Sequence, residues 1–395
     1  MKEITKIVLK SGKDQSVRRY HPWIFSGAIK KIYGNPLEGD LVQVFDNKDE
    51  FLAVGHYQPG SIAVRILSFR DVEIDKSFFR DRLADAFKYR KSLGLTDNKD
   101  TNVFRLVHAE GDDLPGLIID YYNGMVVMQM HSVGMYRQRN EFSEILRDML
   151  GKRLIAIYDK SEGTIPYMAG IPVKDEYLYG ESRGVVTVTE SGFRFMVDWT
   201  TGQKTGFFID QRENRRLLTR YSEGRKVLNM FGYTGAFSVY AMKNASLVHT
   251  VDSSASAIDL AKENIELNFG KDPRHEAFRT DAFEFLSDIK DKYDMIILDP
   301  PAFAKHQNVL SNALQGYKRL NIKAIEQIKR GGIIFTFSCS QVVTKENFRK
   351  SVFAAAANTG RRVRILGQMS QPPDHPVNIY HPESEYLKGL VLYVE

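Results

Sequence analysis

The segment Val227-Leu228-Asn229-Met230-Phe231-Gly232-Tyr233-Thr234-Gly235-Ala236 decides the fold of the C-terminal half of the chain. Its apolar start predicts a buried strand, and its two glycines predict a tight turn into a helix, because glycine adopts backbone angles that other residues avoid. Asp252 ends the next predicted strand about twenty residues later, where a carboxylate can accept hydrogen bonds from both hydroxyls of a ribose. Together these features predict a Rossmann-like site for a nucleoside.

Strands alternate with helices over residues 200–395, which is the pattern of a doubly wound α/β sheet. The predicted strands are Lys226–Phe231, Leu247–Val251, Asp294–Leu298, Gly332–Ser338, Val363–Leu366 and Leu387–Val394. A predicted helix covers Ser254–Asn268. We expect the last of these strands to run antiparallel at an edge of the sheet.

Two further domains are expected before this sheet, because 395 residues are too many for one ordinary core. Residues 1–70 predict a small β-barrel of short strands between Gly and Pro turns, and residues 71–199 predict an α+β domain that ends in a hairpin. The predicted elements are the strands Leu41–Phe45, Phe51–Gly55, Ile62–Leu67, Val103–His108, Gly116–Asp120, Met125–Met130 and Leu154–Tyr158, the helices Phe78–Leu93 and Gln138–Leu150, and the hairpin Val185–Thr189 with Phe193–Val197.

Basic and aromatic residues stand side by side near the start of the barrel. Arg18, Arg19, Tyr20 and Trp23 are candidate RNA-binding residues, since aromatic rings stack on bases and arginines hold phosphates. The same segment also fits a barrel whose core is filled by Trp23 and Phe25, with surface arginines beside them. The residues alone leave both interpretations open.

Composition narrows the classes of protein to consider. The apolar runs are too short to span a bilayer and no signal peptide is visible, so we expect a cytoplasmic protein without a membrane segment. The single cysteine builds no disulfide framework, and the sequence indicates no metal site. A net charge of +6 suits a protein that meets RNA, although many proteins that bind no nucleic acid share it.

The glycine spacing of the turn selects the cofactor. A dinucleotide site needs three glycines so that the pyrophosphate can lie against a helix N-terminus, whereas this turn has the pattern G-x-x-G without a third. S-adenosylmethionine carries no phosphate and is therefore favoured. The candidate contacts in this region are Asn229, Phe231, Gly232, Tyr233, Thr234, Gly235, Asp252 and Ser253.

Two further segments fit the same cofactor. Asp281-Ala282, expected after a further helix, can place an acid near the adenine amino group, with Phe283 against the ring. Asp299-Pro300-Pro301 follows a predicted strand, and its prolines stiffen the loop because each fixes φ. This motif is typical of methyltransferases that act on a nitrogen or carbon of a planar base.

Cys339 follows the predicted strand Gly332–Ser338 and lies between two serines. Ligands of open α/β sheets bind beyond the carboxyl ends of the strands, which places Cys339 at the mouth of the site. A thiolate that adds to carbon 6 of a pyrimidine makes carbon 5 nucleophilic enough to accept a methyl group. The alternative is a small buried hydrophobic residue, but the position at a strand end favours the nucleophile.

The chain resembles the bacterial 23S ribosomal RNA large subunit methyltransferase I family, whose members form 5-methylcytosine. The resemblance is carried by Asn229–Gly235, Val251–Ser253, Leu298–Phe303, Thr336–Ser340 and Asp374–Val377, and it extends to the barrel, which is similar to an RNA-binding PUA domain. It implies cofactor contacts by Phe231, Gly232, Gly235, Asp252, Asp281 and Asp299, with Cys339 as nucleophile. Residues 205–212 resemble the segment that covers the cofactor in this family, and Lys204, Thr205, Phe207, Asp210 and Arg212 are the candidate contacts there.

The chain departs from many RNA 5-methylcytosine enzymes, which carry a second cysteine in the motif that begins at Asp299. Another group, or a water molecule, must then remove the carbon 5 proton, and Lys305 and Asp299 are the candidates. The resemblance implies 23S rRNA as partner and leaves a homodimer open. Three alternatives remain: methylation of a base nitrogen such as guanine N7, a small-molecule methyltransferase, and an RNA-binding protein without catalysis. We expect the first two domains to hold RNA while the target base is flipped into the pocket.

Overall fold

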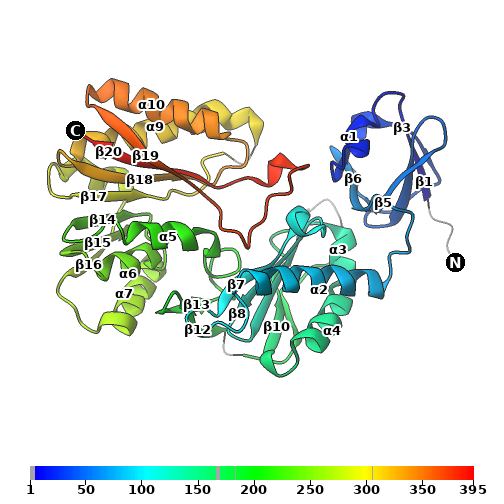
Figure 1. Cartoon of the computed structure of the whole chain (residues 1–395), viewed down its shortest axis with the longest axis horizontal. Coiled ribbons are helices and arrows are strands. Elements are labelled where there is room, and N and C mark those ends of the chain that lie inside the picture. Colours follow the sequence, from blue (N-terminus) through cyan, green and yellow to red (C-terminus); the bar gives the residue numbers. More distant parts are fainter. Residues whose placement is uncertain (1–4, 166–169, 183, 305) are drawn as a thin grey trace. The chain divides into compact units, whose positions relative to one another are not determined.

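The computed structural model describes residues 5–165, 170–182, 184–304 and 306–395. Their contacts form two compact units (Figure 1). Unit 1 comprises Met1–Val186, Val197–Phe207 and Pro373–Ser384, and unit 2 comprises Thr187–Met196, Phe208–Pro372 and Glu385–Glu395. Within the described ranges, none of the helices has the length and apolar character needed to cross a membrane.

The N-terminal part of unit 1 is a six-stranded sheet of order β2-β6-β5-β4-β1-β3. Its strands are β1 (Thr5–Leu9), β2 (Trp23–Phe25), β3 (Ile29–Tyr33), β4 (Leu41–Phe45), β5 (Phe51–Tyr57) and β6 (Ile62–Ser68), and the short helix α1 is Gln15–Arg18. Buried and partly exposed residues alternate along β4, as expected for a strand with one face on a core. The side chains in that core include Ile7, Val44 and Val64. The predicted strands of this region are confirmed.

The second sheet of unit 1 has five strands in the order β11-β10-β9-β8-β7. These strands are β7 (Val103–His108), β8 (Leu117–Tyr122), β9 (Met125–Met130), β10 (Ala156–Asp159) and β11 (Glu176–Tyr179), and the helices are α2 (Lys76–Ser92), α3 (Val133–Arg137) and α4 (Arg139–Leu150). Asp75 caps α2, because its carboxylate accepts a hydrogen bond from the backbone N–H of Phe78. Phe79 of α2 and Phe142 of α4 pack in the core of this sheet.

Unit 2 is built on a seven-stranded sheet of order β16-β15-β14-β17-β18-β20-β19. Its strands are β14 (Lys226–Met230), β15 (Leu247–Asp252), β16 (His275–Arg279), β17 (Met295–Leu298), β18 (Gly332–Ser338), β19 (Val363–Ser370) and β20 (Lys388–Val394). The first five strands in this order are parallel, and β20 pairs antiparallel with both β18 and β19. The doubly wound fold is therefore confirmed.

The expected edge position of the last strand is wrong. β20 lies between β18 and β19, and β19 forms the edge. The apolar run Leu390-Val391-Leu392 is buried, whereas Ile365 and Leu366 of β19 are exposed. A continuous apolar run is typical of a strand that is covered on both faces, and this signal outweighs the position at the end of the chain.

Helices cover both faces of the sheet of unit 2. Figure 1 shows α9 and α10 on one side and α6 and α7 on the other. The helices are α5 (Arg212–Leu218), α6 (Ala236–Met242), α7 (Ala255–Phe269), α8 (Ala282–Phe285), α9 (Leu310–Gln327) and α10 (Lys345–Thr359). Tyr317 of α9 and Phe348 of α10 contribute to the core beneath them.

The contacts divide the chain differently from the sequence expectation. The two domains expected before residue 200 share one unit, and residues 200–207, expected in the C-terminal domain, group with that unit as well. The hairpin of β12 (Val185–Glu190) and β13 (Phe193–Asp198), expected to end the middle domain, contributes Thr187–Met196 to unit 2. Both carboxylate oxygens of Glu190 there accept hydrogen bonds from Arg215 of α5 at 2.8 Å. The segment Pro373–Ser384 lies between β19 and β20 and is called the excursion below. It was expected within the C-terminal domain but groups with unit 1.

Candidate active site

The turn after β14 requires glycine at two positions for steric reasons. A Cβ atom on residue 232 would lie 2.4 Å from the Cγ2 atom of Thr250, which is far inside van der Waals contact. Gly235 has a φ of +74°, and a Cβ atom there would lie 2.9 Å from the Cβ atom of Ala261. The glycines predicted from the sequence therefore allow the turn to pack against β15 and α7.

The residues beside these glycines carry backbone strain. Phe231 and Tyr233 have φ values of 58° and 44°, in the left-handed region that residues with side chains rarely adopt. Asp252 stabilises this conformation, because its Oδ2 atom accepts a hydrogen bond from the backbone N–H of Tyr233 at 2.9 Å. Its Oδ1 atom accepts from the backbone N–H of Ser254. Strain of this kind is found where a binding site imposes a backbone shape.

Other predicted cofactor contacts support the turn or flank it. Asn229 is buried, and its amide donates to Ser238 Oγ at 2.9 Å, while its Oδ1 atom has no hydrogen-bond partner among the described residues. The backbone oxygen of the buried Thr234 accepts from the Asn264 side chain. Ser253 is exposed.

Asp281 follows the strand β16, which in turn follows the helix α7. Its carboxylate caps α8 by accepting from the backbone N–H groups of Phe283 and Glu284. Ala282 is buried. These hydrogen bonds therefore hold the Asp281 carboxylate in place at the start of α8.

Asp299 lies directly after β17 and close to a second acid. Its Oδ2 atom accepts a hydrogen bond from Gln211 Nε2 at 3.0 Å. Loss of solvent, followed by the negative charge of Asp210, raises the pKa of Asp299 to about 7. Asp210 accepts a hydrogen bond from the Tyr386 hydroxyl at 2.7 Å, and its buried Oδ1 atom has no hydrogen-bond partner within the described ranges.

Cys339 lies directly after β18, with its Sγ atom 3.9 Å from the carbonyl oxygen of Pro300. The flanking Ser338 and Ser340 are buried, whereas Cys339 is half-buried. Ser340 Oγ lies 2.9 Å from the Tyr317 hydroxyl, which fixes the backbone beside the thiol. Burial, followed by the charges of the nearby acids, raises the pKa of Cys339 to about 12, so the thiol is protonated at neutral pH.

Lys388 is a residue beside the thiol that the sequence reasoning missed. It is buried at the start of β20, opposite Ser338 in the register, and its Nζ atom donates to the Ser340 carbonyl oxygen at 2.6 Å. Burial lowers the pKa of Lys388 to about 8, and the cation in turn favours the thiolate form of Cys339. A lysine at the start of an otherwise apolar strand was the signal that could have identified it.

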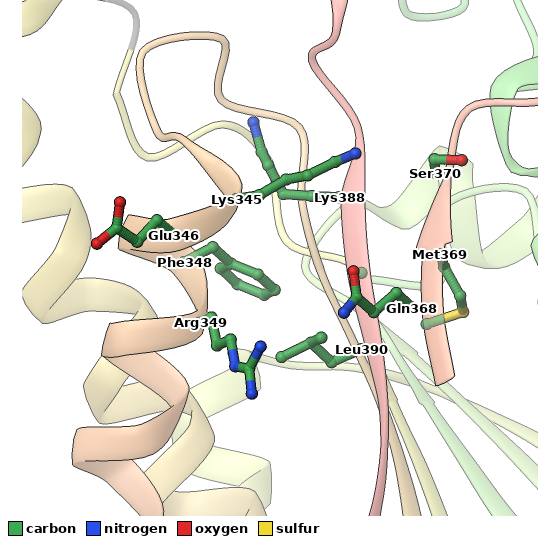
Figure 2. Close-up of a pocket in the computed structure, with 10 residues that line it drawn as sticks. Lys345, Glu346, Phe348, Arg349, Gln368, Met369, Ser370, Lys388 and Leu390 are labelled. Carbon is green, nitrogen blue, oxygen red and sulfur yellow. The ribbon is translucent and has the colours of Figure 1, made fainter. Parts of the chain in front are cut away.

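Lys388 also lines a cavity of about 290 Å³ between α10 and the last two strands (Figure 2). Figure 2 shows Lys345 and Lys388 reaching toward one end of this cavity, with Arg349 at the other. Lys345 forms an ion pair with Glu385. Lys388 is thus common to this cavity and to the surroundings of the thiol.

The segment expected to cover the cofactor is divided between the two units. Lys204, Thr205 and Phe207 belong to unit 1, where Thr205 is buried and donates to Asp120 Oδ2 at 2.6 Å. Asp210 and the buried Arg212 belong to unit 2. The predicted roles of these residues stay predictions, and Lys305 lies outside the described residues.

The RNA-binding candidates lie between α1 and β2 in different surroundings, with Arg18 at the end of α1 and Trp23 at the start of β2. Arg18 hydrogen-bonds to three carboxylates, those of Asp14, Asp46 and Glu50. Arg19 is exposed. Tyr20 is 51% exposed, and its ring lies 5.3 Å from that of Tyr380. Trp23 donates through Nε1 to Glu110 at 2.8 Å, so its polar edge is already engaged within unit 1.

Comparisons with known proteins agree with this arrangement. Residues 105–382 match the S-adenosylmethionine-dependent methyltransferase family, and residues 7–69 match a PUA-like domain. Over 98% of its length the chain is 38% identical to the ribosomal RNA large subunit methyltransferase I of Alteromonas mediterranea, of which it covers 98%. It is 37% identical over 98% to that of Yersinia pestis, of which it covers 99%.

The chain belongs to the ribosomal RNA large subunit methyltransferase I family. A solved methyltransferase structure in complex with S-adenosylhomocysteine shares the fold, with a TM-score of 0.85 at 25% identity over 98% of this chain and 100% of the other. As a member of this family, the chain is an S-adenosylmethionine-dependent methyltransferase.

The residues of unit 2 fit that cofactor. S-adenosylmethionine carries an ammonium and a sulfonium, and a cation near Asp210 and Asp299 would relieve the repulsion between the two carboxylates. The unpartnered, buried Oδ1 atom of Asp210 is an acceptor of the kind that an ammonium group needs. Asp252, at the end of β15, is the acid suited to the ribose. The cofactor supplies the methyl group, and the remaining chemistry falls to the side chains of the chain.

Proposed function

We propose that this enzyme forms 5-methylcytosine in 23S ribosomal RNA through a covalent bond between Cys339 and the base. The named relatives methylate large-subunit ribosomal RNA, and the PUA-like match supports an RNA substrate. The observation that carries the proposal is the placement of a half-buried thiol 3.9 Å from the Pro300 carbonyl of the Asp-Pro-Pro loop. Methylation of a base nitrogen does not need a thiol, so the reaction at a pyrimidine carbon is the one that gives Cys339 a chemical role.

The proposed reaction has two stages, which are addition of the thiol with methyl transfer and then loss of a proton with release of the enzyme. The Cys339 thiol gives its proton to a nearby base as Sγ bonds to carbon 6 of cytosine. The electron pair of the carbon 5–carbon 6 double bond then takes the methyl group from S-adenosylmethionine, whose bond between sulfur and methyl breaks so that S-adenosylhomocysteine leaves. A base then removes the proton from carbon 5, the double bond re-forms, and the bond between sulfur and carbon 6 breaks. The ring returns to aromaticity with one added methyl group.

The titrating groups near the thiol suit these proton transfers. Asp299, with a pKa of about 7, can both accept and donate a proton near neutral pH, which makes it our candidate for the base. Lys305 remains the second candidate. The Lys388 cation favours negative charge on sulfur, although its effect is smaller than the effects of burial and of the acids, which together raise the pKa of Cys339.

We further propose that the first sheet and the cationic cavity hold the RNA. Arg19 and Tyr20 are exposed between α1 and β2, and Lys345, Arg349 and Lys388 line the cavity of unit 2. Arg18 and Trp23 are retained as predicted RNA contacts, together with the expected cytoplasmic location. If deletion of residues 1–70 left RNA affinity and its salt dependence unchanged, the role of the first sheet would be wrong.

The decisive experiment uses ribosomal RNA from cells that lack the enzyme, labelled S-adenosylmethionine and nucleoside mass spectrometry. We expect 5-methylcytosine with the wild type and none with Cys339→Ala. RNA that contains 5-fluorocytosine should trap the wild type as a denaturation-resistant adduct, because fluorine at carbon 5 cannot leave as a proton. Methylation that survives Cys339→Ala, at guanine N7 for example, would overturn the covalent mechanism.

Cys339→Ser is the matched variant for that experiment, since it keeps the size and polarity of the side chain. The chain has one cysteine, so labelling by iodoacetamide reports on Cys339 alone. A folded Cys339→Ser protein that binds S-adenosylmethionine but forms no adduct would assign the loss to the thiol chemistry. If the Cys339→Ala protein still formed the adduct, another residue would be the nucleophile.

A further inference from the structure

Two histidines and a glutamate from distant parts of the sequence meet in unit 1. His21 precedes β2, whereas His381 and Glu383 lie in the excursion Pro373–Ser384. One ligand atom from each of the three lies within 4.8 Å of the others. The Glu383 carboxylate lies 3.5 Å from His21 Nε2 and 3.7 Å from His381 Nε2. Neither the proposed reaction nor the RNA interface uses this cluster.

His381 provides an independent indication that this cluster binds a ligand. Its side chain is 1% exposed, yet neither ring nitrogen has a hydrogen-bond partner among the described residues. A buried imidazole without partners costs free energy, because water is lost and nothing replaces it. The Trp23 ring packs against it with centroids 4.2 Å apart, which holds the imidazole in place but satisfies neither nitrogen.

We propose that His21, His381 and Glu383 bind a zinc ion. Zinc ligands at bond lengths of about 2.0–2.1 Å in tetrahedral geometry are about 3.4 Å apart, close to the separations of the Glu383 oxygens from the two imidazoles. Two nitrogens and one carboxylate are also a donor set that zinc accepts, with water as the fourth ligand. The expectation from the sequence that the chain has no metal site is thereby revised.

The surroundings of the three ligands suit a cation. His21 Nδ1 lies 3.2 Å from both the backbone nitrogen and the carbonyl oxygen of Trp23, so its ring can donate to that carbonyl while Nε2 faces the metal. The zinc ion would fasten the excursion to the segment before β2. Because the two segments are about 360 residues apart in the chain, this link closes a very long loop.

The test is a zinc titration of the full-length protein, stripped of metal by a chelator, in competition with a chromophoric zinc indicator. The Cys339→Ala background removes the thiol as a competing ligand. We expect one zinc ion per chain, and a loss of affinity of about a hundredfold or more for His21→Ala and for Glu383→Gln. His306→Ala and Glu223→Gln, which change exposed residues outside the cluster, are the matched controls and should keep the wild-type affinity.

Cobalt replaces zinc as a spectroscopic probe of the same site. We expect the visible absorption of tetrahedral cobalt in the wild type and the controls, and its loss in Glu383→Gln. Glu383 is 41% exposed in its side chain, so this substitution is compatible with folding. Failure of the stripped protein to bind zinc, or equal affinity in the ligand variants and the controls, would overturn the proposal. Either result leaves the methyltransferase reaction untouched.

Discussion

Two carboxylates, one in each unit, lie in opposite electrostatic surroundings. In unit 1, both oxygens of Asp112 accept hydrogen bonds from Arg90, and one of them also accepts from the backbone N–H of His108. In unit 2, Asp299 accepts from one neutral amide, that of Gln211, and the charge that affects its pKa most is that of Asp210, which Arg215 counteracts only in part. A buried charge that stabilises the fold has a partner of opposite charge. A buried carboxylate whose charge is poorly compensated is typical of a site that binds a ligand or exchanges a proton.

Substitution of Asp299 should therefore lower catalysis without destabilising the fold. We expect Asp299→Asn to lower kcat by about 10²–10⁴-fold, the range for loss of a general base, while the protein stays folded. Initial rates on ribosomal RNA and urea denaturation measure the two effects. An Asp299→Asn enzyme with wild-type kcat would remove Asp299 from the list of candidate bases and leave Lys305.

Substitution of Asp112 should have the reverse effect. Removing one partner of a buried ion pair costs about 3–5 kcal/mol, because the other charge is left buried without compensation. We expect this loss of unfolding free energy for Asp112→Ala, measured in urea, with kcat preserved in the fraction that remains folded. A stable Asp112→Ala protein would mean that Arg90 finds other acceptors, such as the backbone oxygens of Arg105 and Asp374.

The pH dependence of the unfolding free energy is a further test of the surroundings of Asp299. The folded pKa of Asp299 is raised to about 7 from an ordinary 3.8, so its ionisation opposes folding. Below about pH 4 the carboxyl is protonated in both the folded and the unfolded state, so it does not change the free energy of unfolding. As the pH rises to about 7 the carboxyl ionises more readily in the unfolded chain, and the folded state loses stability. Asp299→Asn should thus be more stable than the wild type at pH 8 and similar to it near pH 4. Unfolding at both pH values tests this sign, and an equal difference at both would contradict it.

The rate should follow a bell-shaped pH profile. If Asp299 acts as the base and Lys388 as the cation beside sulfur, kcat/KM rises through about pH 7 and falls above about pH 8. Lys388→Met should lower the rate of iodoacetamide labelling of Cys339 at a fixed pH, while Lys388→Arg should retain it. Equal labelling in both variants would show that the cation does not influence the thiol.

The strands and motifs of unit 2 were predictable because their signals are local. Runs of apolar residues fixed β14 and β18, and sterically required glycines fixed the turn after β14. Long-range partners were not accessible in the same way. Nothing near position 388 in the sequence indicates a contact with Ser340, and nothing near position 21 indicates His381, because such contacts depend on how segments far apart in the chain pack.

The smallest expected effect concerns the predicted RNA contacts. Arg18 is already bound to three carboxylates, so its charge is largely compensated, whereas Arg19 is exposed beside it. We expect Arg19→Ala to weaken RNA binding and to reduce the slope of affinity against salt by about one ion, while Arg18→Ala changes that slope less. Fluorescence anisotropy at several salt concentrations measures both slopes. A larger change for Arg18 would mean that RNA displaces the three carboxylates from Arg18. An arginine that is paired with acids in the free protein would then still be able to bind RNA.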